Sequence, residues 1–143
     1  MALARFNHME LTLPEGALDE AARADIRRFY GELFGFEALD VPILGQQALL
    51  LRTDPETSQF LLLTQVAEPM SSPGYDHLGF LLDSRAEVDG LLARVKDWQG
   101  KDDRVQIKEY EDLVTGGVTV HAFYVKYILP IYFDVQVIER SSS

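Results

Sequence analysis

The chain of 143 residues contains no cysteine. Disulfide bonds therefore cannot form, and zinc sites built from thiolates are excluded. The sequence also has no apolar run as long as a membrane span, and its N-terminus lacks a signal-peptide pattern. From these absences we expect a cytoplasmic protein that has no membrane partner.

Basic residues are few as well, because 13 Lys and Arg stand against 23 Asp and Glu, for a net charge of −10. Nucleic acids and anionic membranes are bound by basic surfaces, so the acidic balance argues against both partners. It is compatible with a cationic or neutral small ligand. The length and the ordinary composition, 47% hydrophobic and 25% charged, suit one domain with a real core over residues 1–143.

A short pattern occurs twice in the sequence. FNHMELTL (residues 6–13) and YDHLGFLL (residues 75–82) both run aromatic, Asn or Asp, His, apolar, and place His8 and His77 at matching positions. Both alternate with the period of two that is typical of a β-strand. In each copy the histidine lies on the face opposite the alternating apolar residues.

An amphipathic helix is predicted after each of these strands. In residues 17–34 and again after residue 84, apolar side chains recur at the spacing of one helical face. They are Ile26, Phe29, Tyr30 and Leu33 in the first helix and Val88, Leu91, Leu92 and Val95 in the second. Gly35 is placed to end the first helix in a left-handed conformation, and Ser84 with Glu87 forms a capping box for the second.

Strand-like runs follow each helix. Their ranges are 47–52 and 59–66 in the first half, and 105–110, 118–126 and 131–138 in the second. The sequence thus predicts an α+β fold of two paired βαβββ modules, residues 5–67 and 75–140. Since one helix covers only one face of a sheet, the other face would line a cavity. His8 and His77 both lie on that second face.

The repeat predicts a metal site. A histidine in a strand is more often structural than a ligand, but a pseudo-two-fold would bring both imidazoles toward one centre. Asp134 stands in the most hydrophobic strand, where a buried unpaired carboxylate is unfavourable unless it meets a cation. It could instead pair with Arg or Lys, or lie at an exposed edge. His8, His77 and Asp134 together suit Fe(II), Mn²⁺, Zn²⁺ or Ni²⁺.

A fourth ligand is missing from the repeat. The position in the first module that corresponds to Asp134 is Leu63, or Leu62 if the alignment shifts by one residue. Either residue is a leucine, which cannot bind a metal. The remaining coordination positions would be open to substrate, water or O₂.

Three further side chains are candidates for catalysis. Glu10 shares the His8 face and could act as a base or a substrate contact, although a salt bridge at the rim would explain it equally well. His121 and Tyr124 have opposite strand phases, so both cannot face the cavity without a bulge. His121 would face it, as an acid or base, if the face of Val118 and Val120 forms the core.

The order of these features resembles the vicinal oxygen chelate superfamily, which includes glyoxalase I, bleomycin-resistance proteins and extradiol dioxygenases. The segments that carry the resemblance are FNHMELTL, FYGELFGFE, DHLGFLLDS and AFYVKYILPIYFDVQVIE. The resemblance implies a cup-shaped, partly open mixed β-sheet barrel with helices outside, and a homodimer. It places metal ligands at His8, His77 and Asp134, the last where the family usually has Glu, and a catalytic role at Tyr124.

The resemblance implies a metal-dependent enzyme whose metal chelates vicinal oxygens of a small-molecule substrate, with lyase, isomerase or dioxygenase chemistry. The alternative is a metal-free ligand-binding or drug-sequestering protein of the bleomycin-resistance kind. The net charge, the leucine at the fourth ligand position and a departure from the dioxygenase signature at residues 127–130 favour this alternative.

Overall fold

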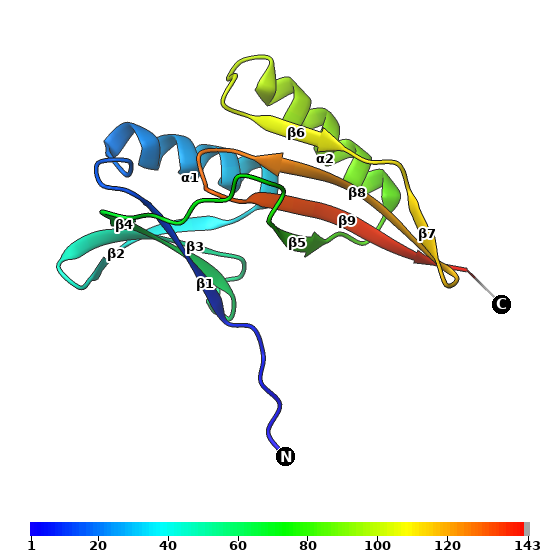
Figure 1. Ribbon diagram of the computed structural model, residues 1–143, viewed down its shortest axis with the longest axis horizontal. Helices are drawn as coiled ribbons and strands as arrows, with labels where there is room; N and C mark the ends of the chain where they lie inside the picture. The colour runs from blue at the N-terminus through cyan, green and yellow to red at the C-terminus, as the bar shows by residue number, and fades with distance from the viewer. Residues whose placement is uncertain (142–143) are drawn as a thin grey trace. The chain divides into compact units, whose positions relative to one another are not determined.

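The computed structural model describes residues 1–141, and the chain divides into two compact units, one of residues 1–71 and one from residue 72 onward. Each unit consists of one mixed β-sheet with one helix on a face of that sheet (Figure 1). The order of elements confirms the predicted α+β fold of two βαβββ modules, with one additional short strand in the second.

The first unit has a four-stranded sheet in the order β1-β4-β3-β2. Its strands are β1 (His8–Pro14), β2 (Glu37–Ile43), β3 (Gln46–Arg52) and β4 (Phe60–Val66). The strands β1 and β4 are parallel, and the other neighbours are antiparallel. The helix between β1 and β2 is part of the crossover that a parallel pair requires.

Helix α1 (Glu20–Phe34) begins and ends where capping chemistry predicts. The side chain of Asp19 accepts a hydrogen bond from the backbone N–H of Ala22, which satisfies one unpaired donor of the first turn. Gly35 adopts the left-handed conformation at φ 74°, and its N–H donates to the carbonyl of Gly31. The predicted role of Gly35 is confirmed.

The core of the first unit lies between α1 and one face of the sheet. The apolar helix residues that the sequence predicted, Ile26, Phe29, Tyr30 and Leu33, are buried. The strand residues whose side chains point toward this helix are buried as well. The leucines among these strand residues are Leu11, Leu13, Leu49, Leu51, Leu61 and Leu63. The opposite phase of β1 carries His8, Glu10 and Thr12, as the alternation predicts.

Strand β2 was not among the predicted strands. It contains Pro42, and a proline inside a run argues against a central strand because it cannot donate a backbone hydrogen bond. The structure places β2 at the edge of the sheet, paired only with β3, where a proline is tolerated. Pro42 therefore hid the strand pattern of β2 in the sequence, although a proline is compatible with an edge strand.

The second unit has a five-stranded sheet in the order β5-β9-β8-β6, with β7 also paired to β8. Its strands are β5 (His77–Leu81), β6 (Gln106–Glu109), β7 (Leu113–Thr115), β8 (Val118–Lys126) and β9 (Tyr132–Arg140). As in the first unit, the histidine-bearing strand β5 is parallel to the last strand, β9.

Helix α2 (Arg85–Gln99) has the predicted N-terminal cap. The Oγ of Ser84 accepts from the N–H of Glu87, and the Glu87 carboxylate accepts from the N–H of Asp83. The helix packs on β8 and β9, and the core side chains include Val88, Leu91, Val95, Phe123, Val125, Phe133 and Val135. Within residues 1–141, neither helix has the length and apolar character needed to cross a membrane.

Candidate functional site

The pairing of the strands identifies the equivalent positions of the two units. In the parallel pair of β5 and β9, His77 lies opposite Tyr132. Tyr132 comes two residues before Asp134 on β9. In the first unit Phe60 takes the place of Tyr132, opposite the histidine of β1. The counterpart of Asp134 is therefore Leu62 rather than the residue after it, which lies in the core under α1. The register decides between the two alternatives that the sequence left open.

The ring of His77 is held in one tautomer. Its Nδ1 lies 2.8 Å from the carbonyl oxygen of Tyr75, and a carbonyl can only accept, so Nδ1–H is the donor. In the neutral ring Nε2 then carries the lone pair. This atom lies 3.4 Å from Oη of Tyr124 and 3.7 Å from Oδ2 of Asp134. Metal-binding histidines commonly donate their other N–H to a backbone carbonyl in this way.

Asp134 is a buried carboxylate, with 8% of its surface exposed. Its Oδ1 is the only buried side-chain oxygen or nitrogen in residues 1–141 that has no hydrogen-bond partner. No Arg or Lys of the described chain forms an ion pair with it, and Nε2 of His77 lies 3.7 Å from its Oδ2. Burial raises the pKa of Asp134, and the positive charge that His77 carries when protonated partly opposes this effect. An oxygen left without a partner beside an imidazole lone pair fits a bound cation.

In the first unit, Nδ1 of His8 also carries the hydrogen, but its acceptor is a side-chain amide instead of a backbone carbonyl. The Nδ2–H of Asn7 donates to the carbonyl of Ser58, which fixes the orientation of the amide. The amide oxygen of Asn7 then lies 2.7 Å from Nδ1 of His8 and accepts a hydrogen bond from Nδ1–H. The ring is stacked on Phe60 at 4.9 Å. Both histidines of the repeat therefore present Nε2 as the unprotonated nitrogen of a neutral ring.

Glu10 lies on the same face of the first sheet as His8. Its carboxylate accepts a hydrogen bond of 2.7 Å from the hydroxyl of Thr64, a buried residue on β4. No ion pair of Glu10 occurs among the described residues, so a rim salt bridge does not explain it. The hydrogen bond orients the carboxylate, and its role as a base or substrate contact stays a prediction.

Strand β8 is regular, so His121 and Tyr124 point to opposite sides of the sheet. The buried face of β8 is that of Phe123 and Val125, which has the phase of His121 and packs toward α2. Tyr124 lies opposite Asp134 in the pairing of β8 with β9 and shares its face. Of the two candidates, Tyr124 is the one that the structure brings to the His77 side chain.

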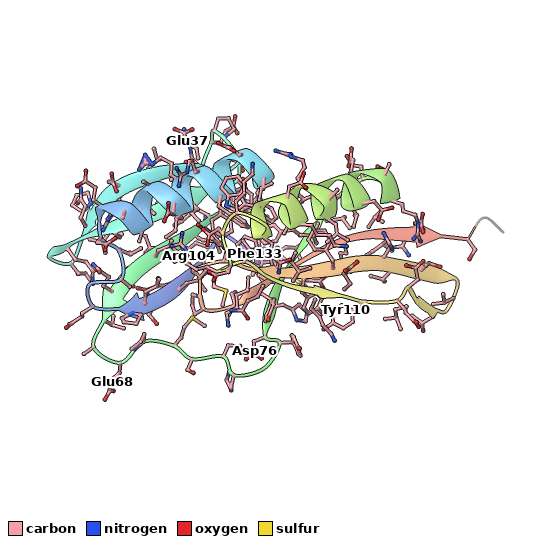
Figure 2. The ribbon with its side chains drawn as sticks, turned by 90° about the horizontal axis from the view of Figure 1, so that it is seen from above. Glu37, Glu68, Asp76, Arg104, Tyr110 and Phe133 are labelled. Carbon is pink, nitrogen blue, oxygen red and sulfur yellow. The ribbon has the colours of Figure 1, made fainter. Side chains whose placement is uncertain are left out.

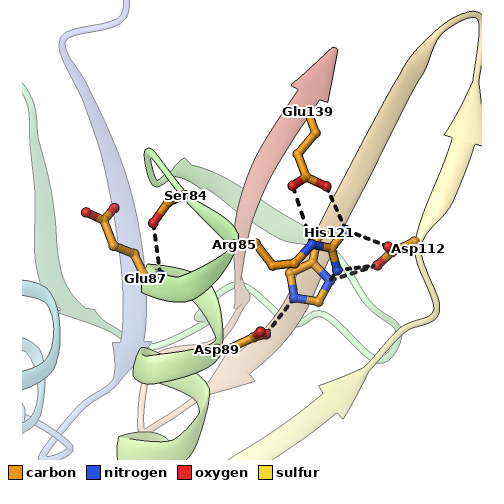
Figure 3. A network of polar contacts seen from close by, with 7 residues as sticks. All are labelled: Ser84, Arg85, Glu87, Asp89, Asp112, His121 and Glu139. Carbon is orange, nitrogen blue, oxygen red and sulfur yellow. Dashed lines mark hydrogen bonds and ion pairs between the residues drawn. The ribbon is translucent and has the colours of Figure 1, made fainter. Parts of the chain in front are cut away.

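His121 belongs to a network of ion pairs on the helix side of the sheet, shown in Figure 3. Its Nε2 lies 2.6 Å from Asp89 of α2, and its Nδ1 lies 2.7 Å from Asp112, which precedes β7. Arg85 joins Asp112 to Glu139 of β9. The hydrogen bond with Asp89 is the main cause that raises the pKa of His121, although partial burial opposes it.

Several aromatic residues around His77 carried no site prediction. Tyr124 lies between the ring of His77 and that of Tyr110, with centroids 4.6 Å away in each case. Tyr132 lies 6.2 Å from Tyr124 and 5.3 Å from Tyr75. Figure 2 labels Tyr110, which follows β6. These rings come from four separate segments, so no local pattern could have grouped them, although Tyr132 has the strand phase of Asp134.

The predicted site residues are thus found in two groups. His77, Tyr124 and Asp134 meet on one face of the second sheet, whereas His8 and Glu10 lie on one face of the first. Within residues 1–141 there is no group of three or more His, Asp or Glu side chains arranged to hold a metal ion. The predicted three-ligand set of His8, His77 and Asp134 stays a prediction.

Comparison with solved structures shows the same fold over nearly the whole chain. The genomically encoded fosfomycin resistance protein FosX of Listeria monocytogenes has a TM-score of 0.67 at 16% identity, covering 94% of this chain and 91% of its own. A mutant of that protein, solved with Mn(II) and 1S,2S-dihydroxypropylphosphonic acid, has a TM-score of 0.62 at 14% identity and covers 99% and 95%.

A lactoylglutathione lyase from Agrobacterium tumefaciens is similar to the same extent, with a TM-score of 0.62 at 18% identity over 96% of each chain. No protein-family model and no curated protein sequence matches this chain. The chain therefore has the fold of glyoxalase and fosfomycin resistance proteins, which is the vicinal oxygen chelate fold that the sequence resemblance implied. At these identities the similarity defines the fold and leaves the activity open.

Proposed function

We propose that this protein is a divalent-metal-dependent enzyme that acts on a small molecule with two adjacent oxygen atoms. The metal ligands are His8, His77 and Asp134. The observation that carries the proposal is the buried Oδ1 of Asp134, which has no hydrogen-bond partner within residues 1–141 and belongs to a carboxylate that lies beside Nε2 of His77. Two nitrogens and one carboxylate are a common set for Mn²⁺, Fe²⁺, Zn²⁺ or Ni²⁺.

A metal bound there would act as a Lewis acid on the substrate oxygens. The chain supplies the proton chemistry. Burial, followed by the negative charge of Asp134, raises the pKa of Tyr124, so its phenol stays protonated and can donate a hydrogen bond to a substrate oxygen. Glu10, oriented by the hydroxyl of Thr64, serves as the base. Lyase, isomerase and addition reactions all use such a donor and acceptor.

The structural relatives support this class of function. One is a lactoylglutathione lyase, and another was solved with Mn(II) and a dihydroxypropylphosphonic acid. The metal-free binding protein remains the second candidate, because Leu62 occupies the position equivalent to Asp134 and cannot be a ligand. The two candidates differ in whether the protein binds a metal at all.

Metal binding by the purified protein tests the proposal directly. We expect one Mn²⁺ per chain by calorimetric titration after treatment with chelator. His8→Ala and Asp134→Ala should each lose this binding, since each removes one of three ligands. At a metal concentration of about 100 times Kd, the wild-type protein should gain about 2.7 kcal/mol of stability, seen as a higher melting temperature.

His121→Ala is the matched control, because it removes a histidine that faces α2, and it should bind Mn²⁺ like the wild type. If the wild-type protein takes up no metal from Mn²⁺, Fe²⁺, Zn²⁺ or Ni²⁺, the enzyme proposal is wrong. Binding that survives both ligand substitutions would show that the metal is held elsewhere.

A further inference from the structure

Two lysines lie on the face of the second sheet that carries His77 and Asp134. Lys108 is opposite Tyr124 in the pairing of β6 with β8, and Lys126 is opposite Gln106 in the same pair. Residues paired across strands point to the same side of a sheet. Because Tyr124 is in turn opposite Asp134, both lysines share the face of the candidate site.

The two lysines are diagonal neighbours across β6 and β8. Side chains at such positions start about 7–8 Å apart, within reach of each other for residues as long as lysine. Two positive charges on neighbouring side chains repel each other, and an anion bound between them would offset this repulsion. The pair therefore favours an anion at this point of the sheet.

Neither lysine has a carboxylate partner among residues 1–141. The ammonium group of Lys108 lies over the rings of Tyr75 and Tyr110, at 5.8 and 5.5 Å from their centroids. That of Lys126 lies over the ring of Tyr132 at 5.3 Å. Such cation–π contacts are weak at exposed positions, and a charge-assisted hydrogen bond to an anion is stronger.

This arrangement is unusual for a chain with 23 acidic and 13 basic residues. On strands β5, β6, β8 and β9, the charged side chains of this face are Lys108, Lys126, Arg140 and the buried Asp134, so the local charge is opposite in sign to the net charge of −10. Other lysines and arginines of the second unit, such as Lys96 and Arg85, do pair with carboxylates. Lys108 and Lys126, which lack a carboxylate partner within residues 1–141, both lie against tyrosine rings of this sheet.

We propose that Lys108 and Lys126 form a subsite for an anionic group of the substrate, a carboxylate or a phosphonate, with the tyrosines Tyr75, Tyr110 and Tyr132 packing against its carbon skeleton. The inference rests on the proposed function in that it takes this face to be the substrate side. It specifies the substrate as a small anion, in contrast to the cationic or neutral ligand that the net charge suggests.

Titration with simple aromatic probes tests the subsite without the metal. Phenylphosphonate, benzoate, benzyl alcohol and benzylammonium share one ring and differ in charge. In the presence of EDTA, we expect phenylphosphonate to bind the wild-type protein more tightly than benzoate, and both more tightly than the neutral and cationic probes. Added NaCl should weaken phenylphosphonate binding, because salt screens exposed charges.

Lys108→Gln and Lys126→Gln should each weaken phenylphosphonate binding about tenfold, as expected for the loss of one charge-assisted contact. Lys101→Gln, which makes the same charge change in the turn before β6, is the matched control and should bind like the wild type. The inference is wrong if phenylphosphonate does not bind, if benzyl alcohol or benzylammonium binds as tightly, or if the two lysine variants match the control.

A parallel titration with Mn²⁺ in place of EDTA separates this inference from the proposed function. Lysine-dependent binding of phenylphosphonate by a protein that takes up no metal would support the anion subsite and reject the metal enzyme. Metal uptake that depends on His8 and Asp134, together with lysine-independent binding of phenylphosphonate, would reject the subsite alone.

Discussion

Asp134 shows how a single residue can oppose the stability of its own fold. Its carboxylate is buried on β9, and one of its oxygens has no hydrogen-bond partner among the residues that the structure describes. A buried polar atom without a partner costs about 1–3 kcal/mol relative to the same atom in water. Such a side chain suggests a function that the fold alone does not explain.

Asp134→Asn should therefore stabilise the metal-free protein at neutral pH, by about 1 kcal/mol. The amide carries no charge to desolvate, and its N–H can donate to the lone pair of His77. Since burial raises the pKa of Asp134 in the folded state, the wild-type protein loses stability as the pH rises from the unfolded value of 3.8 through the folded pKa.

The measurement is the melting temperature of both proteins in EDTA between pH 4 and pH 8. The advantage of the Asn variant should be greatest at neutral pH and should shrink toward acidic pH, where the wild-type carboxyl is neutral. A variant that is less stable than the wild type at pH 7 would show that the charged carboxylate is stabilised by the fold.

Leu62 permits a gain-of-function test, since the strand register makes it the counterpart of Asp134. We expect Leu62→Glu to tighten Mn²⁺ binding about tenfold, or about 1.4 kcal/mol, by adding a fourth ligand. Without metal the variant should be less stable, because the new carboxylate lies directly opposite Glu10 in β1 and like charges repel.

Leu62→Gln is the control for size and polarity, and it should leave Mn²⁺ affinity close to that of the wild type. Leu63→Glu would instead place a charge in the core under α1 and should prevent folding. If Leu62→Glu and Leu62→Gln bind Mn²⁺ equally, the two modules do not contribute to one metal site.

Strand β8 separates two kinds of chemistry by its two faces. Tyr124 faces the side of His77 and Asp134, whereas His121 faces α2 and joins the ion pairs of Figure 3. Asp112 of this network lies two residues after Tyr110, whose ring packs on Tyr124. The network thus holds the segment between β6 and β7 close to the helix, and His121 contributes to it through Asp89 and Asp112.

The stabilisation from His121 should depend on pH. Its hydrogen bond with Asp89, and a second with Asp112, raise the pKa of His121 in the folded protein above the ordinary value of 6.5. A raised histidine pKa gives stability that is fully present below pH 6.5 and is lost as the pH rises through the folded pKa. The wild-type protein should therefore exceed His121→Gln in melting temperature at about pH 6 by more than at about pH 9.

Asp89→Asn removes the main cause of the raised pKa and should reduce this pH dependence. Mn²⁺ binding should be unchanged in both variants, because neither residue lies on the candidate site. If the difference in melting temperature between wild type and His121→Gln stayed constant across this pH range, the prediction that the network stabilises protonated His121 would be wrong.

At the scale of elements, the sequence predicted most of the fold correctly because hydrophobic periodicity and caps are local. Both helices, the caps at Gly35 and Ser84 and the strand phases of His8 and His77 are confirmed. The strand that was not predicted, β2, contains a proline that only an edge position tolerates. The short β7 has just three residues, too few for a period to be visible.

At the scale of the whole molecule, net charge and local charge point to different ligands. The net charge of −10 makes binding of nucleic acid unfavourable and, taken alone, suggests a cationic ligand. The face around His77 instead carries Lys108 and Lys126, which have no carboxylate partner in the described part of the chain. A ligand responds mainly to nearby charges, since exposed charges beyond about 8–10 Å are screened at physiological salt.

The sequence by itself determined the two modules, the matching histidines and the phase of Asp134, because each depends on spacing along one short segment. Tertiary structure decided that Leu62 is the counterpart of Asp134, and it turned Tyr124 toward His77 and His121 toward Asp89. It also grouped Lys108 and Lys126 with tyrosines from separate segments. These outcomes depend on which strands pair and in which register, and hydrogen bonds between residues distant in the sequence set both.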